Sequence, residues 1–236
     1  MKSISRILIF YFKKVVAYKE TPQSEAIEEI DFERKIGAQK HHVELTLAVY
    51  PMSQDQQNSK PTLKFKLANN DLKPFEIKAL ENGFSNGLYS GPLLGFPILG
   101  ADFEIKSVNI ASRTSETMIA AAMREAIKKV LKKANTCLME PMMKLTIHAE
   151  PEVVGSLISD LTVNRRGEIL SHEELKTMII LEAKAPLSEL RGYSTQLRIT
   201  SSGKAFFGME FSHDELMDLN AQNKAIENVT GFKPRY

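Results

Sequence analysis

The sequence lacks the features that mark disulfide-rich, metal-binding and membrane-spanning proteins. It contains a single cysteine, Cys137, which excludes an internal disulfide framework and which we interpret as a small buried hydrophobe. The five histidines show no metal-ligand spacing. The apolar run near the N-terminus, residues 7–12, is far too short to cross a membrane. We therefore expect no metal site and no membrane partner.

The sequence also lacks the parts of a catalytic nucleotide site. A GTPase needs the pattern G-x-x-x-x-G-K-[ST], whose backbone N–H groups hold phosphates, and no such string occurs. The nearest fragment, Ser202 to Ala205, has neither the spacing nor the final hydroxyl, and Asn69 to Leu72 is not a guanine-reading N-K-x-D motif. We predict no catalytic and no cofactor-binding residues, so the chain alone is not expected to be an enzyme.

The net charge of the chain says little about what the chain binds. The chain has 31 Lys and Arg against 29 Asp and Glu, a formal charge of +2 at pH 7, which does not indicate nucleic-acid binding by itself. If RNA is the partner, the basic residues must be concentrated locally. With 236 residues, 43% of them hydrophobic and 25% charged, the chain is long enough for two modest domains that each bury a core.

The second half of the chain is patterned as β-α-β-β-α-β. Met142 to His148 alternates apolar and polar residues as a half-buried strand does. After Pro151, apolar residues recur at helical spacing up to Leu161, and Gly167 is the predicted stop. Two apolar runs, a second helical pattern and a last strand follow, at residues 169–170, 178–185, 187–197 and 205–211. This order predicts an α+β, ferredoxin-like sandwich with helices on one face of an antiparallel sheet.

The first half predicts a separate domain. Val43 to Val49 and Leu63 to Leu67 alternate as two strands, with a polar segment between them. Pro74 opens a helix that two glycines interrupt. The loop G-P-L-L-G-F-P-I-L-G at residues 91–100 contains two prolines and three glycines, which prescribe a rigid turning segment.

A long helix is predicted after that loop, over residues 114–134. Thr114 or Ser115 can cap its N-terminus, and Glu116 lies in the positive first turn. Four lysines lie near its negative C-terminal end: Lys128, Lys129, Lys132 and Lys133. Compensation of the helix dipole explains them, and a surface that faces RNA is the alternative.

Several of these motifs, in this order, resemble elongation factor G. V-A-Y-K-E-T at residues 16–21 resembles the strand that closes its domain III, and the loop at 91–100 resembles the G-P-L-x-G-x-P-V that precedes the long helix of its domain IV. E-P-M-M-K-L at 140–145 and P-L-S-E-L-R-G-Y-S-T at 186–195 resemble its last domain. The resemblance covers about residues 15–220, and this collinearity is more specific than any single match.

The resemblance implies three parts of the chain. Residues 1–22 would be a remnant of domain III or a non-native N-terminus. Residues 23–137 would form a domain IV with a fold like domain 2 of ribosomal protein S5, and residues 138–236 a ferredoxin-like domain V with a C-terminal tail. The basic and apolar start of the chain also suits a mitochondrial import sequence. Whether the chain is a natural short product or an incomplete gene model stays open.

Two predicted tip loops of domain IV separate the branches of this family. For the translocating factors, the resemblance implies a glycine-rich first loop and a histidine in the second. Here residues 36–42 hold one glycine and residues 109–115 hold no histidine. With S-R-T-S-E-T-M-I at 112–119, the loops look more like the mitochondrial ribosome-releasing branch, which splits post-termination ribosomes together with ribosome recycling factor. Translocation, and a free-standing RNA-binding module without a motor, are the alternatives.

Partners and contact residues follow from the resemblance as well. It implies a monomer that binds the ribosome through ribosomal RNA and the base of the stalk, in the mitochondrial matrix or, alternatively, in the cytoplasm. GTP and Mg are expected only in the N-terminal GTPase domain of the family. The candidates for RNA contact are basic residues of the tip loops and the last domain: Lys40, His41, His42, Arg113, Arg165, Arg166 and Arg198.

One segment departs from the family pattern. Asp160 to Gly167 is a residue longer than the D-L-x-x-R-R-G of the relatives. Because one inserted residue turns a helix by about 100°, either the helix end loops out or the two arginines point elsewhere than in the relatives.

Overall fold

The structure, a computed structural model, describes residues 16–67 and 72–232. The chain divides into two compact units. Of the described residues, the first unit comprises 18–139 and 216–232, and the second comprises 16–17 and 140–215. The predictions made for residues 1–15 and for Asn69 to Asp71 lie outside the described residues.

The first unit contains a four-stranded mixed sheet. Its strands, in the order β2-β3-β5-β4, are Ala26–Ile36, Gln39–Pro51, Ala101–Ile110 and Thr62–Phe65. β4 runs parallel to β5, and the other neighbours are antiparallel. The sequence predicted β3 and β4 but missed β2 and β5. Only three of the eleven residues of β2 are buried. Its charged side chains interrupt the alternation of apolar and polar residues that marks a strand, so the sequence did not predict it.

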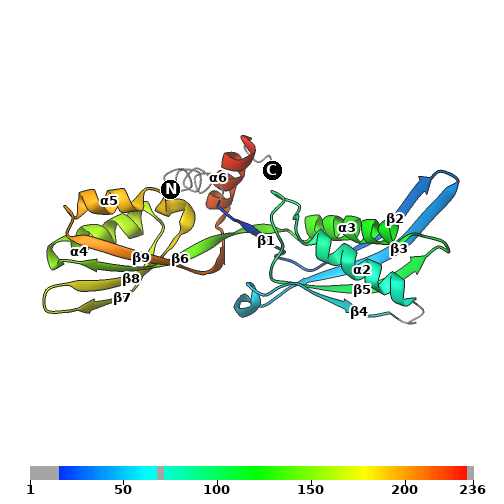
Figure 1. Cartoon of the computed structure of the whole chain (residues 1–236), viewed down its shortest axis with the longest axis horizontal. Helices are drawn as coiled ribbons and strands as arrows, with labels where there is room; N and C mark the ends of the chain where they lie inside the picture. Colours follow the sequence, from blue (N-terminus) through cyan, green and yellow to red (C-terminus); the bar gives the residue numbers. More distant parts are fainter. Residues whose placement is uncertain (1–15, 68–71, 233–236) are drawn as a thin grey trace, which may run out of the picture. The chain divides into compact units, whose positions relative to one another are not determined.

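Two helices cover one face of this sheet (Figure 1). They are α2 (Pro74–Gly87) and α3 (Glu116–Lys133), which pack against each other as well as on the strands. Gly83 permits this approach, since a Cβ atom there would lie 2.7 Å from the carbonyl oxygen of Ala120. Ser115 is the N-cap of α3 as predicted, although its side chain makes no capping bond.

Two peripheral segments pair with the start of β6 (Cys137–Ala149) inside the first unit. β1 (Lys19–Thr21) is antiparallel to its first three residues. Ahead of α6 (Leu219–Thr230), the Met217 N–H donates to the Leu138 carbonyl at 3.0 Å. The Leu138 N–H in turn donates to the side chain of Gln222 at 2.8 Å. These bonds explain why the division differs from the predicted one, which gave residues 1–22 to a remnant and the tail to the last domain.

The second unit has the predicted β-α-β-β-α-β order. From β6 the chain passes through α4 (Pro151–Ser159), β7 (Glu168–Glu174), β8 (Ile179–Pro186), α5 (Tyr193–Thr200) and β9 (Ala205–Leu216). β9 pairs with β6, β6 with β8, and β8 with β7. Both helices lie on one face of the sheet (Figure 1). The ferredoxin-like α+β prediction is confirmed.

Both helical predictions of the second unit need correction at their ends. The pattern at 187–197 is two elements, a 3-10 turn (Leu187–Leu190) and α5, separated by Gly192 with φ of 71°. After α4 the chain adds a π-helical turn, Asp160–Asn164. Because a π turn takes one more residue than an α turn, it absorbs the extra residue of this segment. The helix stops before Gly167, and Arg166, not Gly167, adopts the left-handed φ of 50°.

Candidate nucleic-acid interface

The hairpin of β2 and β3 ends in a two-residue turn. Ile36 pairs with Gln39, and Gly37 between them has φ of 62°, a left-handed conformation that favours glycine. All residues from Glu33 to Lys40 are exposed. The hairpin therefore extends beyond the core (Figure 1), and most of the predicted first tip loop is strand.

The second tip loop, residues 111–115, is bonded to the hairpin. The Ala111 N–H donates to the His42 carbonyl at 3.0 Å. The side-chain amide of Gln39 donates to the Arg113 carbonyl. The two loops thus form one tip, and the structure brings all four residues predicted there to the same end of the first unit.

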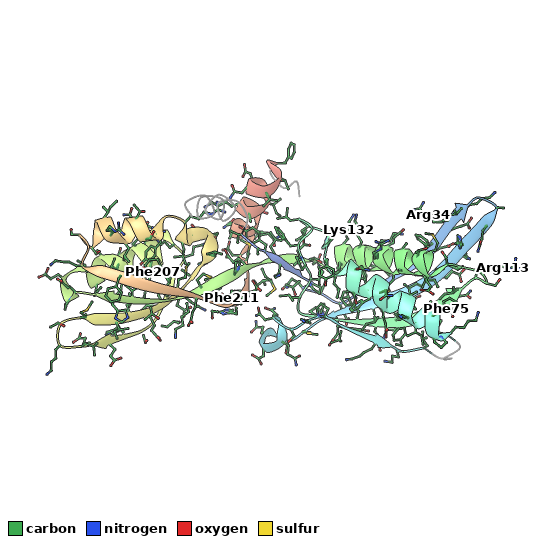
Figure 2. The ribbon with its side chains drawn as sticks, in the orientation of Figure 1. Arg34, Phe75, Arg113, Lys132, Phe207 and Phe211 are labelled. Carbon is green, nitrogen blue, oxygen red and sulfur yellow. The ribbon has the colours of Figure 1, made fainter. Side chains whose placement is uncertain are left out.

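The cations at this tip differ in how they are held. Lys40 is paired with Glu33 at 2.8 Å, and the Arg34 guanidinium lies 5.5 Å from the ring centre of Phe32. Arg113 is exposed, and its guanidinium makes no ion pair with a residue that the structure describes. Figure 2 shows Arg34 on the hairpin and Arg113 on the adjacent loop.

Sequence reasoning missed Arg34 and its neighbour Lys35, which is also exposed and lies opposite Lys40. The available signal was the end of apolar alternation after Phe32, followed by a run of charges.

The adjacent histidines have different surroundings. His41 is 5% exposed, and its Nδ1 accepts a bond from the Ser115 N–H at 3.4 Å. His42 lies 2.6 Å from Asp31 through its Nε2. Strand alternation turns His41, one of the predicted RNA contacts, to the covered face of the sheet. His41 positions the second tip loop and offers little surface to a partner.

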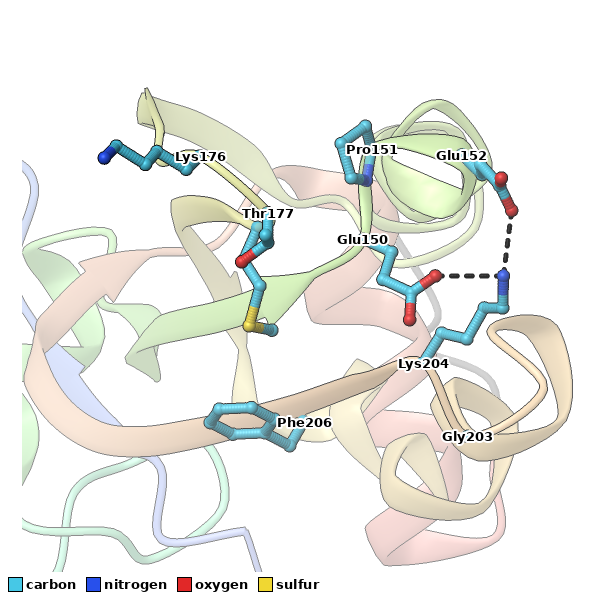
Figure 3. A pocket seen from close by; sticks show the side chains of 9 residues that line it. Glu150, Pro151, Glu152, Lys176, Thr177, Gly203, Lys204 and Phe206 are labelled. Carbon is cyan, nitrogen blue, oxygen red and sulfur yellow. Dashed lines mark hydrogen bonds and ion pairs between the residues drawn. The ribbon is translucent and has the colours of Figure 1, made fainter.

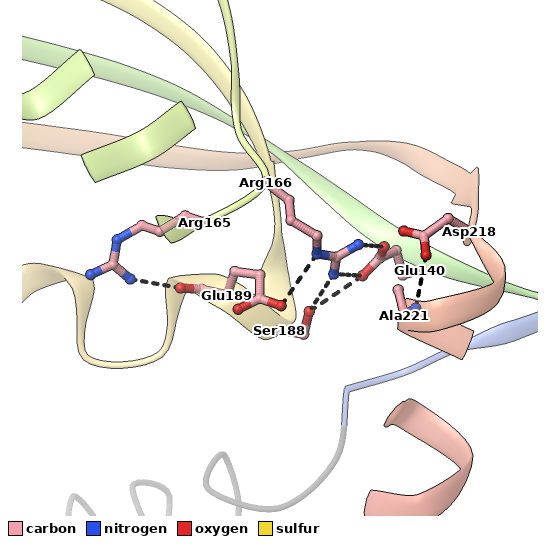
Figure 4. Close-up of polar contacts among 7 residues, drawn as sticks. All are labelled: Glu140, Arg165, Arg166, Ser188, Glu189, Asp218 and Ala221. Atoms are coloured by element: carbon pink, nitrogen blue, oxygen red, sulfur yellow. Dashed lines mark hydrogen bonds and ion pairs between the residues drawn. The ribbon is translucent and has the colours of Figure 1, made fainter. Parts of the chain in front are cut away.

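Arg165 is used inside the second unit. Its Nε donates to Asp160 at 2.7 Å. Its Nη1 donates to the Glu189 carbonyl at 2.6 Å (Figure 4). The guanidinium also lies 4.7 Å from the ring centre of Tyr193. The side chain is only 12% exposed, so it stabilises the end of the π turn and presents little charge to a nucleic acid.

Arg166 is similarly occupied. It binds both oxygens of Glu140, at 2.7 and 2.9 Å, and lies 3.3 Å from Glu189 (Figure 4). The Glu140 side chain is 4% exposed. Hydrogen bonding to Glu140 raises the pKa of Arg166 above its usual value. Of the predicted arginines in this unit, only Arg198, in the last turn of α5, stays exposed without an ion pair to any described residue.

A pocket of about 790 Å³ opens in the second unit (Figure 3). Lys204 reaches Glu152 at 2.8 Å and Glu150 at 2.9 Å, and these carboxylates raise the pKa of its ammonium. Phe206 is stacked on His148 with ring centres 4.7 Å apart. This lysine belongs to the fragment nearest to a P-loop, and its acidic neighbours disfavour a phosphate there.

A buried carboxylate joins two of the sequence motifs. Glu20, in β1, is 0% exposed and accepts N–H bonds from the loop at 91–100. The donors are Leu93 and Leu94 at 2.9 Å and Phe96 at 3.0 Å. Gly91 makes room for the carboxylate, since a Cβ atom there would lie 2.2 Å from its Oε2. The motif at residues 16–21 and the loop at 91–100 therefore contact each other through the Glu20 carboxylate.

Residues 16–67 and 72–232 hold neither a metal-ligating cluster nor a membrane-spanning helix. No three His, Cys, Asp or Glu side chains gather there as a metal site would require. No helix in the same ranges is both long and apolar enough to cross a membrane.

Comparisons with known proteins give one family for both units. The family model "Elongation factor G, domain IV" matches residues 14–135, and "Elongation factor G C-terminus" matches residues 137–225. A crystal structure of a Thermus thermophilus protein has a TM-score of 0.82 at 24% identity, and the match covers 93% of this chain and 32% of that one. This likeness confirms the fold of both units.

Curated relatives agree with the family models. "Ribosome-releasing factor 2, mitochondrial" of Danio rerio is 34% identical over 92% of this chain and 28% of its own length. "Elongation factor G" of Thermotoga petrophila is 34% identical over 91% of this chain and 31% of its own length. The chain thus spans less than a third of these relatives. It belongs to the elongation factor G family and carries the family's domain IV and C-terminal domain.

Proposed function

We propose that the chain is the ribosome-binding portion of a translation factor that disassembles mitochondrial ribosomes after termination, together with ribosome recycling factor. Relatives named as mitochondrial ribosome-releasing factors, from Danio rerio and from Drosophila persimilis at 30% identity, support both the activity and the matrix location. In this proposal the first unit is an arm that reaches into the ribosome, and the second binds near the base of the stalk.

The observation that best supports this proposal is the geometry and charge of the tip of the first unit. A hairpin with a two-residue turn, bonded to the loop at 111–115, gives a short tip with little freedom. Arg34, Lys35 and Arg113 give it exposed positive charge. Translocation requires a tip that follows a moving codon–anticodon duplex. A braced basic tip is better suited to a vacant site whose RNA surface stays in place, since bracing lowers the entropy lost on binding.

A chimaera tests this proposal. The matching third of a Thermotoga elongation factor G is replaced by this chain, and the product is assayed for ribosome splitting with ribosome recycling factor and for translocation. We expect splitting to proceed and translocation to stay near background. A matched chimaera that carries the same third of the Danio rerio releasing factor serves as the control. Fast translocation without splitting would contradict the proposal.

One observation favours translocation as the alternative function. The Thermotoga petrophila elongation factor G is as similar to the chain, at 34% identity, as the Danio rerio releasing factor. The paired assays of the chimaera therefore decide between the two activities. Neither activity requires the chain itself to bind GTP, and equilibrium dialysis of the purified chain is expected to find no micromolar GTP binding.

A further inference from the structure

The basic residues of α3 fall into two groups. Lys133 donates to the Ile27 carbonyl at 2.9 Å and lies 3.3 Å from Glu28, so it fastens α3 to β2. Lys129 is paired with Glu125 at 2.9 Å, one turn earlier on the same helix. Both of these lysines have partners inside the first unit, and their charges are locally balanced.

The second group has no such balance. Arg124, Lys128 and Lys132 are exposed, and none makes an ion pair with a described residue. Their spacing of four residues aligns them along one face of the helix. We call these three residues the α3 basic stripe; Figure 2 labels its last member, Lys132.

Helix stability does not explain the stripe. Like charges four residues apart destabilise a helix by a few tenths of a kcal/mol, about 0.2–0.5 for each pair. The helix dipole favours cations only in the last turn, which accounts for Lys132 but not for Arg124 in the middle of α3. The stripe therefore carries a small cost to folding, which points to a role outside the chain.

We propose that the α3 basic stripe binds the sugar–phosphate backbone of an RNA duplex. The inference rests on the proposed function, because ribosomal RNA would supply that duplex. Three cations aligned on a helix complement a row of phosphates, and such contacts need no base sequence.

The composition of α3 selects this occupant over two others. A protein partner would bury apolar side chains at the centre of the contact, and a single-stranded nucleic acid would stack its bases on aromatic rings. No large hydrophobic or aromatic side chain of Glu116–Lys133 is exposed. Next to the stripe the helix carries two small residues, Thr117, which is exposed, and Ala121, which is half-buried, so a phosphate backbone can approach closely.

The test compares two double variants on the same helix. Lys128→Gln with Lys132→Gln neutralises the stripe, and Lys129→Gln with Lys133→Gln removes equal charge from adjacent, internally paired lysines. The probe is a blunt RNA duplex of mixed sequence, and binding of the full chain is measured by fluorescence anisotropy at several salt concentrations. The single variant Lys129→Gln is a further control in case the loss of Lys133 alters folding.

We expect the stripe variant to bind at least tenfold more weakly at low salt. The slope of log affinity against log salt concentration should become less steep by about 2, since each phosphate contact contributes about 0.9 to that slope. Adding Arg124→Gln should flatten the slope by about 1 more. The control variants should keep the slope of the unaltered chain.

Equal losses in both double variants would overturn the proposal, because they would reflect overall charge. Tighter binding of polyglutamate than of RNA, with the same dependence on the stripe, would overturn it in favour of an acidic protein. Ribosome pelleting separates the two levels of inference. If the chain pellets with ribosomes and the stripe variant pellets equally well, the stripe proposal fails and the proposed function stands. If the unaltered chain does not pellet at low salt, the proposed function fails.

Discussion

Arg113 in the first unit and Arg166 in the second share an uncommon backbone conformation. Both have positive φ, 67° and 50° respectively, in segments that join a helix to a strand. Arg113 leaves its guanidinium exposed without an ion pair to any described residue, whereas Arg166 holds both oxygens of buried Glu140. The same residue type in a similar local conformation is available to a partner in one unit and bound internally in the other.

The difference lies in the neighbours that the fold supplies. Glu140 precedes Arg166 by 26 residues and comes from β6, so no local pattern announces the pair. Near Arg113 the tip hairpin supplies a glutamine side chain to its carbonyl but no carboxylate to its guanidinium. Candidate RNA contacts are therefore best ranked by whether a buried acid already holds them.

The largest effect is expected at Glu20, a buried carboxylate of the first unit, which tests whether backbone N–H groups hold a charge as firmly as a guanidinium does. Glu20→Ala leaves three N–H donors of the 91–100 loop without their acceptor. We expect a loss of about 3 kcal/mol in the free energy of unfolding. Urea denaturation followed by circular dichroism measures it. Glu25→Ala, at an exposed residue of the same unit, should change stability little, and an equally small loss in Glu20→Ala would refute the role of this carboxylate.

A direct test of the comparison replaces each arginine by alanine. Arg166→Ala removes the guanidinium from the Glu140 carboxylate, which is 4% exposed and keeps the Ser188 hydroxyl as a donor. We expect a loss of about 2 kcal/mol, less than the 3–5 of a fully buried pair, because Arg166 is 35% exposed. Arg113→Ala should stay within about 0.5 kcal/mol of the unaltered chain. Exposed Arg191 provides the matched control within the second unit, and similar losses for Arg113 and Arg166 would remove the distinction.

The buried phenol of Tyr193 predicts how the stability of the second unit depends on pH. It is 1% exposed, and its hydroxyl has no hydrogen-bond partner among the described residues. Burial, with the nearby charge of Asp160, raises its pKa to about 12. Between pH 10 and pH 12 the unfolded chain ionises this phenol while the folded chain does not, so the raised pKa lowers stability as the pH rises.

Tyr193→Phe should remove that part of the alkaline loss, about 1 kcal/mol by pH 11. Near neutral pH it should raise stability slightly, since it removes a buried hydroxyl that has no hydrogen-bond partner among the described residues. Urea midpoints at pH 8, 10 and 11 for both proteins measure the difference. Parallel pH dependence in the two proteins would show that this phenol ionises normally in the folded chain.

The smallest effect on stability and the clearest on binding are expected at the tip. Arg34→Gln with Lys35→Gln removes two exposed charges outside the core. Unfolding should change by less than about 0.5 kcal/mol. The salt slope of ribosome binding should fall by about 1 for each phosphate that these side chains no longer bind. The same assay on Arg165→Gln should show no change in slope, because that guanidinium is held by Asp160 and Glu189.

Regular periodicity explains which predictions were confirmed. The strand through Leu45 and Leu47 and the long helix α3 bury one continuous stripe each, so their patterns are visible in the sequence. Motif order was equally informative: the models for domain IV and for the C-terminus match residues 14–135 and 137–225, in the order that the resemblance implied. β2 was not predicted because its distal half extends beyond the core. The residues there are all exposed, so no alternation of buried and exposed side chains marks them as a strand.

The candidate site was harder to predict because partners distant in the chain set it. Four basic residues were expected at the tip, and the structure gathers them, but it buries His41 and adds Arg34 and Lys35. A comparable division runs through α3, where adjacent lysines look alike in the sequence. Only the positions of Glu125, Glu28 and the Ile27 carbonyl show which of them are already paired.

The sequence alone determined the two-domain order, the ferredoxin-like pattern, the lack of a P-loop and the resemblance to elongation factor G, because periodicity and motif order are properties of the chain. The tertiary structure decided which charges remain available: Arg165 and Arg166 are held in the second unit, while Arg113 and the α3 basic stripe are exposed in the first. The physical reason is that a charge is balanced by whatever lies within a few ångströms of it, and those neighbours come from strands and loops far apart in the sequence.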